Sequence, residues 1–462
     1  MNIQFFGATQ EVTGSCYLIT VGDSRLLVEC GLVQGSVEHE RHNSDEFPFS
    51  ASEIDAVVLT HAHIDHSGRL PLLVKRGFNG KIYSHSATTD LCAIMLEDSG
   101  YLNEKNAYWE NKKRERKGLE LIEPLYTKDQ AKQAHSHFKS LGYQQTKEIL
   151  PGIKLTFRDA GHIIGSCIAE LELTEASRSK KVVFSGDLGH KNAPILRDPE
   201  PIPQADLLVM ESTYGDRLHR DWNNTLQEIG EIIGNANSQK GNILIPAFTV
   251  GRTQELLYLL NQHYDEWNIA DWEIFLDSPM GIKATEIYAS HAEIYDKHAK
   301  KIKHQHGKLF NLPNLHFSEK TEYSMKINQI KSGAIIIAGS GMCTGGRIKH
   351  HLKHNIWRNH CHVLIIGYQA RGTLGRSLVD GTKRIYLWGE EIQVKAKIHT
   401  VGGLSAHADQ QELLDWYSHF ENSPQVALVH GEPKAMDSLQ KKLTGEFGCK
   451  VFQADYKQIL KL

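Results

Sequence analysis

The sequence predicts an α/β protein in which a second, doubly wound α/β domain is inserted into the first. Three observations support this fold class. Short apolar runs typical of buried strands alternate with helical patterns along the chain. Four of these runs end in clusters of His, Asp or Glu, and a second set of strands and helices stands between the third cluster and the fourth. With 462 residues, the chain is long enough for two or three domains of roughly 100 to 200 residues each.

The first set of predicted strands lies at residues 55–60, 181–186, 207–211 and 425–430. Each run is rich in Val, Leu or Ile, as expected of a strand that is buried on both faces. Catalytic residues commonly follow the ends of such strands in α/β proteins. We therefore expect the four clusters of polar residues to meet at one edge of the first domain.

The second set of strands indicates a separate, doubly wound α/β unit. Its predicted strands are at residues 242–248, 272–278, 332–340 and 362–368, and helical patterns follow Gly251 and Gly346. We expect residues 1–211 to form the first part of one domain, 212–395 the inserted domain and 396–462 the rest of the first domain.

Composition and sequence ends argue against membrane insertion or secretion. No segment reaches the roughly 18 uninterrupted apolar residues of a membrane span. Residues 1–19 lack the features of a secretory signal, and their alternation predicts a strand. The seven cysteines are odd in number and include no C-x-x-C pair, which predicts reduced thiols and no thiolate zinc site. We expect a cytoplasmic protein without membrane contact.

Charge is close to balanced, with a formal net charge of −3, so a nucleic-acid substrate would need a local basic surface. The segment at about 101–150 is polar and helical in pattern, and it contains the run KKRERK at residues 112–117. Such a run usually forms a solvated helix face, which we favour over an RNA-contacting patch. The 26 histidines are an unusually high number, and imidazole is the commonest metal ligand.

The strongest local signal is four candidate metal ligands within six residues, directly after a predicted strand. They are His61, His63, Asp65 and His66. Alternation along an extended turn would direct His61 and His63 to one ion, while Asp65 and His66 reach a neighbouring ion. The spacing therefore predicts two metal ions.

Further ligands are expected from other strand ends, because a catalytic zinc usually has three protein ligands and an open position. His162 and Asp187 each follow an apolar run and stand among glycines, which let the backbone approach closely. A carboxylate can bridge two cations about 3.5–4 Å apart. Taken alone, each residue would be a turn former or a core residue, but beside the first cluster both are better interpreted as ligands.

These residues resemble the motifs of the metallo-β-lactamase superfamily, and specifically of its β-CASP nucleases. The stretch from His61 to His66, then His162 and then Asp187, is similar to the second, third and fourth superfamily motifs. Glu211, His407 and His430 resemble motifs A, B and C of the β-CASP branch, in that order. The branch includes the nuclease subunit of the eukaryotic pre-mRNA cleavage and polyadenylation factor and its bacterial and archaeal relatives. The resemblance covers essentially the whole chain.

The resemblance implies a four-layer αββα metallo-β-lactamase sandwich with an inserted β-CASP domain. It also implies two Zn²⁺ ions per chain, one held by His61, His63 and His162, the other by Asp65, His66 and His430, with Asp187 bridging both. One departure is Glu29, where the family usually has Asp; we expect it still to support the metal loop, with an altered metal affinity. The chain also stops soon after His430, without the extension of RNase J-like members, which weakens a direct RNase J assignment.

The mechanism that we expect begins with a hydroxide shared by two zinc ions, which attacks phosphorus in line. Asp65 is the expected acceptor of its proton. His407 is expected to protonate the departing ribose oxygen, with Glu211 orienting His407 and raising its pKa.

A glycine-rich loop before a helix is a candidate phosphate site, since free backbone N–H groups and the helix dipole favour an anion there. Its candidate contacts are Ser340, Gly341, Gly345, Gly346, Arg347 and, from another helix start, Arg252. The alternatives are a plain glycine turn and ordinary ion pairing of the two arginines. Tyr214, Phe248 and Tyr368 are candidates for stacking on bases, although core packing is favoured for Phe248.

The function predicted from the sequence is a zinc-dependent phosphodiesterase, a ribonuclease that cleaves single-stranded RNA in processing or decay. An endonuclease and a 5′–3′ exonuclease both remain open, as does single-stranded DNA as the substrate. The alternatives are a small-molecule lactonase or thioesterase, and a metal-free scaffold of an RNA-processing complex. The oligomeric state is also open, with a homodimer as one option.

Overall fold

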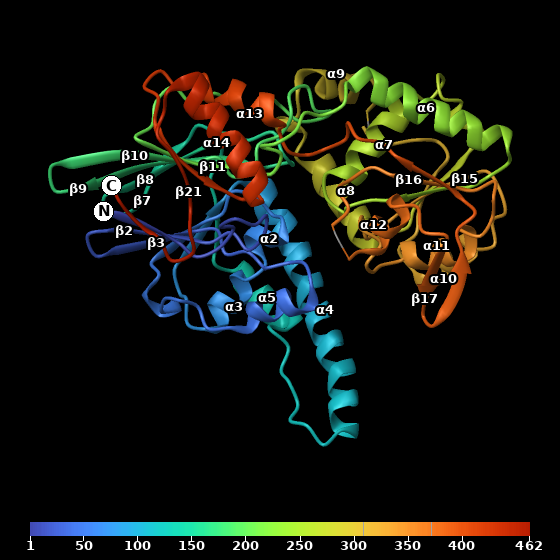
Figure 1. Ribbon diagram of the computed structural model, residues 1–462, viewed down its shortest axis with the longest axis horizontal. Coiled ribbons are helices and arrows are strands. Elements are labelled where there is room, and N and C mark those ends of the chain that lie inside the picture. Colours follow the sequence, from blue (N-terminus) through green and yellow to red (C-terminus); the bar gives the residue numbers. More distant parts are fainter. Residues whose placement is uncertain (308, 371) are drawn as a thin grey trace. The chain divides into compact units, whose positions relative to one another are not determined.

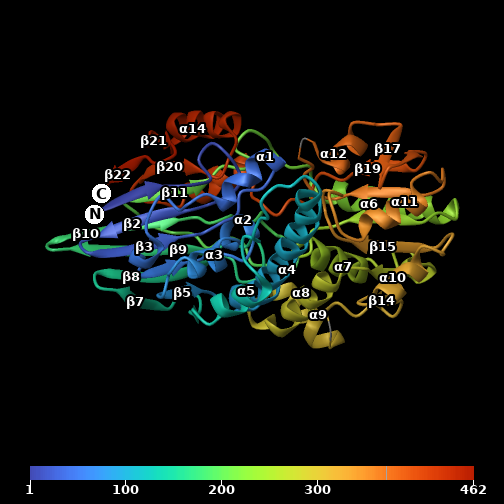
Figure 2. The ribbon, with the colours of Figure 1, turned by 90° about the horizontal axis from the view of Figure 1, so that it is seen from below.

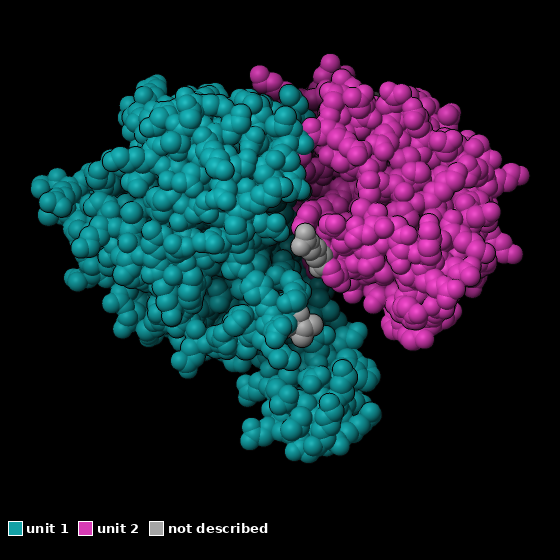
Figure 3. All heavy atoms as spheres, in the orientation of Figure 1, with its two compact units in different colours: residues 1–193, 197–218, 407–462 teal, residues 194–196, 219–406 magenta. Residues whose placement is uncertain are grey.

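The computed structural model describes residues 1–307, 309–370 and 372–462. These residues form two compact units, coloured separately in Figure 3. Unit 1 consists of residues 1–193, 197–218 and 407–462, and unit 2 of residues 194–196 and 219–406. Unit 2 is thus formed almost entirely by one continuous insertion into unit 1.

The first sheet of unit 1 has the strand order β22-β1-β2-β3-β4-β5-β6. The strands β3 to β6 run parallel, whereas β1 pairs antiparallel with both β2 and β22. Its members are β1 (Asn2–Phe5), β2 (Tyr17–Val21), β3 (Ser24–Val28), β4 (Ala56–Val58), β5 (Lys81–Ser84), β6 (Phe138–Ser140) and β22 (Ile459–Lys461).

The second sheet of unit 1 has the order β21-β20-β11-β10-β9-β8-β7. The strands β10, β11, β20 and β21 are parallel neighbours. Its members are β7 (Thr146–Leu150), β8 (Ile153–Asp159), β9 (Cys167–Glu175), β10 (Arg178–Phe184), β11 (Leu207–Glu211), β20 (Gln425–Val429) and β21 (Val451–Gln453).

The two sheets pack face to face around one apolar core. Ile3, Ile19 and Val28 of the first sheet join Phe157 and Phe184 of the second in a single buried cluster. Helices cover the outer faces (Figures 1 and 2): α3 (Leu70–Lys75), α4 (Ser86–Arg116) and α5 (Lys128–His135) on the first sheet, and α13 (Gln410–Tyr417) and α14 (Pro433–Phe447) on the second. This arrangement confirms the predicted αββα sandwich. The shorter helices of unit 1 are α1 (Val37–Glu40) and α2 (Ile64–Ser67).

The segment that was predicted as helical over about 101–150 is helical only in part. Helix α4 ends at Arg116, and α5 follows with a capping box at Thr127. The last third of the segment forms β6 and β7, so that part of the prediction is wrong. Both are edge strands with mostly exposed or half-buried side chains, and such strands lack the apolar alternation that would reveal them in the sequence.

Unit 2 is built on a parallel sheet with the order β14-β13-β15-β12-β16-β19, a doubly wound arrangement. Its strands are β12 (Ile243–Pro246), β13 (Glu273–Leu276), β14 (Leu315–Phe317), β15 (Ala334–Ala338), β16 (His362–Ile365) and β19 (Lys397–Thr400), with a separate hairpin of β17 (Arg384–Leu387) and β18 (Glu390–Gln393). Its helices are α6 (Trp222–Ser238), α7 (Arg252–Gln262), α8 (Pro279–Ser290), α9 (Lys297–His306), α10 (Thr321–Ile327), α11 (Ile348–Asn355) and α12 (Leu374–Val379).

The chain returns to unit 1 later than residue 396, where the sequence placed the boundary. Residues 397–400 form β19, which pairs with β16 and completes the sheet of unit 2, and unit 1 resumes at His407. The sequence of β19, KIHT, has only one apolar residue, so its pattern offered no reason to place this strand in the inserted domain.

Among the described residues, no helix is both long and apolar enough to cross a membrane. All seven cysteines are buried free thiols, as predicted.

Candidate metal centre

Parallel strands bring three of the predicted site residues to one edge of the second sheet. Phe184 of β10 is in register with Val209 of β11, and Glu211 of β11 is in register with Val429 of β20. Asp187 and His430 follow the ends of β10 and β20, while Glu211 is the last residue of β11. Three residues that are distant in sequence therefore lie side by side because their strands end together.

The loop from His61 to His66 reaches the same place from the first sheet. His61 and His63 follow β4, and Asp65 and His66 lie in the short helix α2. The carbonyl of His63 accepts from the amides of His66 and Ser67 and so begins this helix. The hydroxyl of Thr60 lies 3.0 Å from Nδ1 of His61, so this nitrogen has a partner and Nε2 points into the site.

One group of potential ligands consists of His61, His63, His162 and Asp187, whose ligand atoms all lie within 4.8 Å of one another. Nδ1 of His63 is 3.1 Å from Nε2 of His61 and 3.1 Å from Nε2 of His162. Oδ2 of Asp187 is 3.3 Å from Nε2 of His61. His61, His162 and Asp187 are buried, whereas His63 is half-buried.

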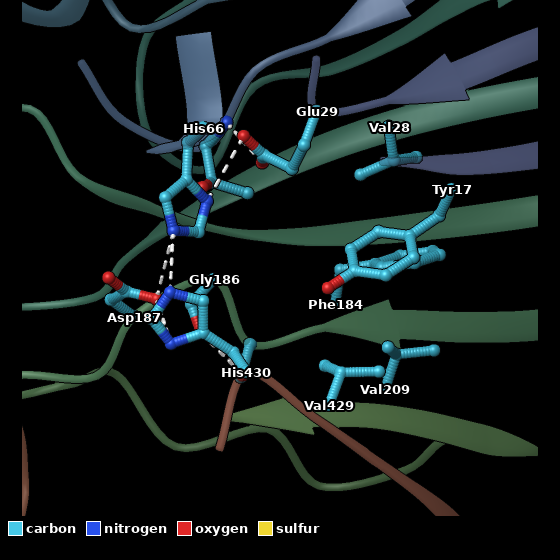
Figure 4. A pocket seen from close by; sticks show the side chains of 12 residues that line it. Tyr17, Val28, Glu29, His66, Phe184, Gly186, Asp187, Val209, Val429 and His430 are labelled. Carbon is cyan, nitrogen blue, oxygen red and sulfur yellow. Dashed lines mark hydrogen bonds and ion pairs between the residues drawn. The ribbon is translucent and has the colours of Figure 1, made fainter. Parts of the chain in front are cut away.

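A second group consists of Asp65, His66 and His430. Nε2 of His66 is 3.3 Å from Nε2 of His430 and 3.4 Å from Oδ1 of Asp187. Nε2 of His430 is 3.4 Å from Oδ2 of Asp65. In Figure 4 the rings of His66 and His430 both point toward the carboxylate of Asp187, which links the two groups.

Glu29 lies behind the second group, at the end of β3. One carboxylate oxygen accepts a hydrogen bond from the amide of Thr60, and the other lies 3.3 Å from Nδ1 of His66 (Figure 4). The side chain of Glu29, longer than that of Asp, thus still reaches the loop of His61 to His66. The backbone of Glu29 has a φ of 63°. This backbone conformation is uncommon outside glycine, so the placement of the carboxylate is imposed by the surrounding fold.

The protonation states at the site match what a divalent cation requires. Burial lowers the pKa of His61 and His162, and it lowers the pKa of His63 to about 3, so these rings are neutral. Neutral imidazole is the form that binds metals. Nδ1 of His63 stands 3.1 Å from a nitrogen of each of the other two rings, although a neutral imidazole has only one N–H to donate, and Oδ1 of Asp187 is buried without a hydrogen-bond partner. Cations in this space would satisfy these atoms, so the residues fit a metal centre.

His407 and Glu211 form a pair beside the first group. Nδ1 of His407 donates to Glu211, with 3.2 Å to the nearer oxygen, and the His407 ring lies 4.6 Å from that of His162. Burial lowers the pKa of His407, but the carboxylate of Glu211, together with Asp187 and Asp65, outweighs it and raises the pKa to about 9. His407 is therefore a protonated imidazole beside the ligand cluster.

Two residues that support the ligands were missed in the sequence. Thr60 orients His61, and the hydroxyl of Thr213 lies 3.0 Å from Nδ1 of His430. In each case the hydroxyl contacts Nδ1 of the ring, while Nε2 lies near other potential ligands, and such supporting contacts are typical of metal-binding histidines. Thr60 directly precedes His61, and Thr213 stands two residues after Glu211. Nearness to a motif residue was the one signal in the sequence that could have identified them.

The glycine-rich loop of unit 2 is closed on itself. The hydroxyl of Ser340 accepts from the amide of Gly345, and a Cβ on Gly346 would lie 2.1 Å from the carbonyl oxygen of Gly339. A Cβ on Gly341 would lie 2.7 Å from the ring of Phe248, so this ring packs on the loop. These contacts explain Gly341 and Gly346 by close packing, which favours the turn interpretation for this loop.

The two arginines that were candidates for phosphate binding are engaged within unit 2. Arg252 is buried and pairs with Glu255. Nη1 of Arg347 donates to Asp277 at 2.7 Å, and its guanidinium also donates to the carbonyls of Ser318 and Glu319. With these donors occupied, ion pairing inside unit 2 is the better account of both side chains.

Replacement of Asp277 by alanine is expected to destabilise unit 2. Asp277 is fully buried and accepts from Arg347, Ser324 and His351, so its loss leaves a guanidinium and an imidazole without their acceptor. Removing one partner of a buried ion pair usually costs about 3–5 kcal/mol. Urea unfolding measures the change, with Glu319→Ala as a control because only the backbone of Glu319 takes part in this network.

Three family models match the chain. They are the metallo-β-lactamase superfamily over residues 9–234, the β-CASP domain over 253–378, and the Zn-dependent metallo-hydrolase RNA specificity domain over 391–454. A protein named Ribonuclease TTHA0252, from Thermus thermophilus, is 37% identical over 96% of this chain and 96% of its own. The chain belongs to the β-CASP family of the metallo-β-lactamase superfamily.

Two further proteins are similar to this chain. Transcription termination factor FttA of Methanocaldococcus jannaschii is 31% identical, over 94% of this chain and 67% of its own length. A crystal structure of a protein of unknown function from Enterococcus faecalis superposes with a TM-score of 0.57 at 11% identity, covering 100% of this chain and 99% of that one, which shows a shared fold. The β-CASP assignment confirms the family predicted from the motifs.

Proposed function

We propose that this β-CASP protein is a zinc-dependent hydrolase that cleaves phosphodiester bonds of single-stranded RNA. The observation that carries the proposal is the convergence of seven candidate ligands, from four chain segments, on two adjoining groups linked by Asp187. The match to an RNA specificity domain and the relative named as a ribonuclease both support RNA as the substrate. The cytoplasmic location and a homodimer remain predictions.

In this proposal His61, His63 and His162 would hold one zinc and Asp65, His66 and His430 a second, and the carboxylate of Asp187 lies within reach of both ligand groups. The first set is supported by its three neutral, converging imidazoles. For the second set, burial lowers the pKa of His66, but Asp187, Asp65 and Glu29 raise it well above the usual value. These carboxylates therefore attract positive charge, which a cation would supply in place of the proton.

Bound zinc at these residues supplies Lewis-acid activation of water and of the scissile phosphate. Asp65 is positioned to take up the proton of the attacking water. Burial raises the pKa of Asp65, but a hydrogen bond from His430 and the nearby imidazoles lower it below its usual range, so the acceptor is ionised. His407 holds a proton that it can donate to the departing ribose oxygen, and Glu211 keeps the ring in place through Nδ1.

The decisive experiment incubates zinc-loaded protein with end-labelled single-stranded RNA and DNA of one sequence and follows product lengths over time. Cleavage of RNA, with or without cleavage of DNA, supports the proposal, and the pattern of lengths distinguishes internal cuts from stepwise shortening. Hydrolysis of lactones or thioesters with no cleavage of either nucleic acid would overturn it in favour of a small-molecule hydrolase. A protein that binds no zinc would instead be a scaffold.

Glu29→Gln is expected to weaken zinc binding without removing any ligand. The change retains the shape of the side chain but removes the charge 3.3 Å from Nδ1 of His66, and changes in such supporting groups typically cost about 10- to 100-fold in metal affinity. Competition with a zinc-sensitive dye measures the affinity. Glu29→Asp, which retains the charge, is the matched comparison; equal affinities for all three proteins would exclude a role of Glu29 in supporting the metal loop.

A further inference from the structure

Helix α4 extends beyond the other elements of unit 1 as an arm (Figures 1 and 3). One face of the arm is covered by the segment that returns from its tip. Asn111 exchanges two hydrogen bonds with the backbone of Ile122, Arg114 donates to the carbonyl of Glu120, and Ala107 is buried. The arm is therefore held in shape by its own return segment, and its other face is left to solvent.

That open face carries aromatic, aliphatic and basic side chains. At helical spacings of three, four and seven residues, neighbouring side chains share a face. We call this face the arm stripe: Tyr101, Leu102, Lys105, Tyr108, Trp109, Lys112, Lys113 and Arg116, all of them exposed. The acidic residues Glu104 and Glu115 lie at one border of the stripe, and Glu110 lies at the other, 3.7 Å from Lys113.

Cations and rings are interleaved on the arm stripe. Nζ of Lys112 stands 4.7 Å from the ring centre of Tyr108 and 5.4 Å from that of Trp109. The two rings are 53% and 54% exposed, and their centres are 5.3 Å apart. Exposed aromatic rings accept stacked bases, and adjacent cations neutralise phosphates, which is the combination used by proteins that bind single strands. A stripe for protein docking alone would not need four cations among its rings.

We propose that the arm stripe is a binding site for the RNA strand at a distance from the metal centre. The proposal rests on the function proposed above and names a substrate contact of that same enzyme. The first turn of α4 contacts the loop that carries His162, because the hydroxyl of Thr88 donates to the carbonyl of Gly165 at 2.6 Å. Trp109 lies about 30 Å further along the helix, at 1.5 Å per residue. A strand stacked at about 3.4 Å per nucleotide needs about nine nucleotides to span that distance.

Strand length therefore provides the test. Zinc-loaded wild type and the double variant Tyr108→Ala/Trp109→Ala are compared on RNAs of six and twenty nucleotides, with kcat and KM measured for each. The KM for the long RNA is expected to rise by about fivefold to a hundredfold, the range for loss of base stacking, while its kcat and both constants for the short RNA stay unchanged. Circular dichroism confirms that α4 is intact.

Tyr323→Ala is the matched control. Tyr323 is 51% exposed and carries Lys326 5.6 Å from its ring centre, but it lies on α10 of unit 2. Its replacement should leave the KM for the long RNA unchanged.

A second variant, Lys112→Gln/Lys113→Gln/Arg116→Gln, should lessen the salt dependence of binding to a twenty-nucleotide phosphorothioate RNA. The slope of log affinity against log salt concentration should fall by about 0.7 for each phosphate that the variant no longer neutralises.

The proposal is overturned if the aromatic double variant binds and cleaves the long RNA as the wild type does. It is also overturned if that variant instead loses self-association in sedimentation, or loses binding to anionic lipid vesicles, while RNA binding is retained. If the wild type cleaves no RNA at all, the proposed function fails, and equilibrium binding of the phosphorothioate RNA still decides whether the arm stripe contacts a single strand.

Discussion

Asp187→Ala is expected to abolish RNA cleavage and to lower the zinc content of the purified protein. The carboxylate of Asp187 reaches both ligand groups, at 3.3 Å from Nε2 of His61 and 3.4 Å from Nε2 of His66. Metal ions supply several kcal/mol of transition-state stabilisation, which corresponds to at least about a thousandfold in rate. Atomic absorption and cleavage of end-labelled RNA measure the two effects.

Two comparisons make this result specific. Asp159→Ala removes another buried carboxylate, which accepts from the amide of Gly161, next to His162, but belongs to neither ligand group. Burial raises the pKa of Asp159 to about 7, so this variant tests whether loss of any buried carboxyl group near the site has the same effect. Full zinc content together with wild-type cleavage in Asp187→Ala would show that the seven residues do not form the catalytic centre.

His407→Ala is expected to slow RNA cleavage by about 10²- to 10⁴-fold, the usual contribution of a general acid, and to leave the zinc content unchanged. Nδ1 of His407 pairs with Glu211, and His407 belongs to neither group of potential ligands. The outcome would therefore separate proton transfer from metal binding. Single-turnover cleavage of a labelled RNA gives the rate, and metal analysis of the same sample gives the zinc content.

The pH dependence of the two proteins provides a further comparison. A general acid works only while protonated, and the pKa of His407 is raised to about 9. The wild-type rate should therefore hold at neutral pH and fall as the pH rises through this pKa, at a somewhat lower value when nearby cations oppose protonation. His407→Ala should lack this descending limb. If His407→Ala retains the same descending limb, the loss of rate at high pH is due to another titrating group.

Much of the site could be predicted because its signals are local in the sequence. The ligands from His61 to His66 stand together, and Asp187 and His430 directly follow apolar runs that form β10 and β20. Strand ends and metal-ligand types are both visible in a short window of residues. The doubly wound sheet of unit 2 was visible for the same reason, since β12, β15 and β16 are buried along their whole length and β13 alternates between buried and more exposed residues.

The features that the sequence did not reveal depend on partners distant in sequence or on strands with a polar pattern. Arg347 was a candidate for phosphate binding because it starts a helix after glycines, but its partner Asp277 lies 70 residues earlier. Thr213 supports His430 across 217 residues, and hydroxyl residues are too common for such a role to be visible in one sequence. The strands β6, β7 and β19 were missed because edge strands with polar faces carry no clear periodicity.

The order of the segments along the chain has a consequence for biosynthesis. Unit 1 is interrupted by the whole of unit 2, and β22 at the C-terminal end of the chain pairs with β1 at its start. Chains are made from the N-terminus onward, and domains generally fold as units during synthesis. A nascent polypeptide therefore lacks both His407 and His430 until all of unit 2 has been synthesised. A ribosome that stalls within the insertion would release a fragment unable to degrade the transcripts around it.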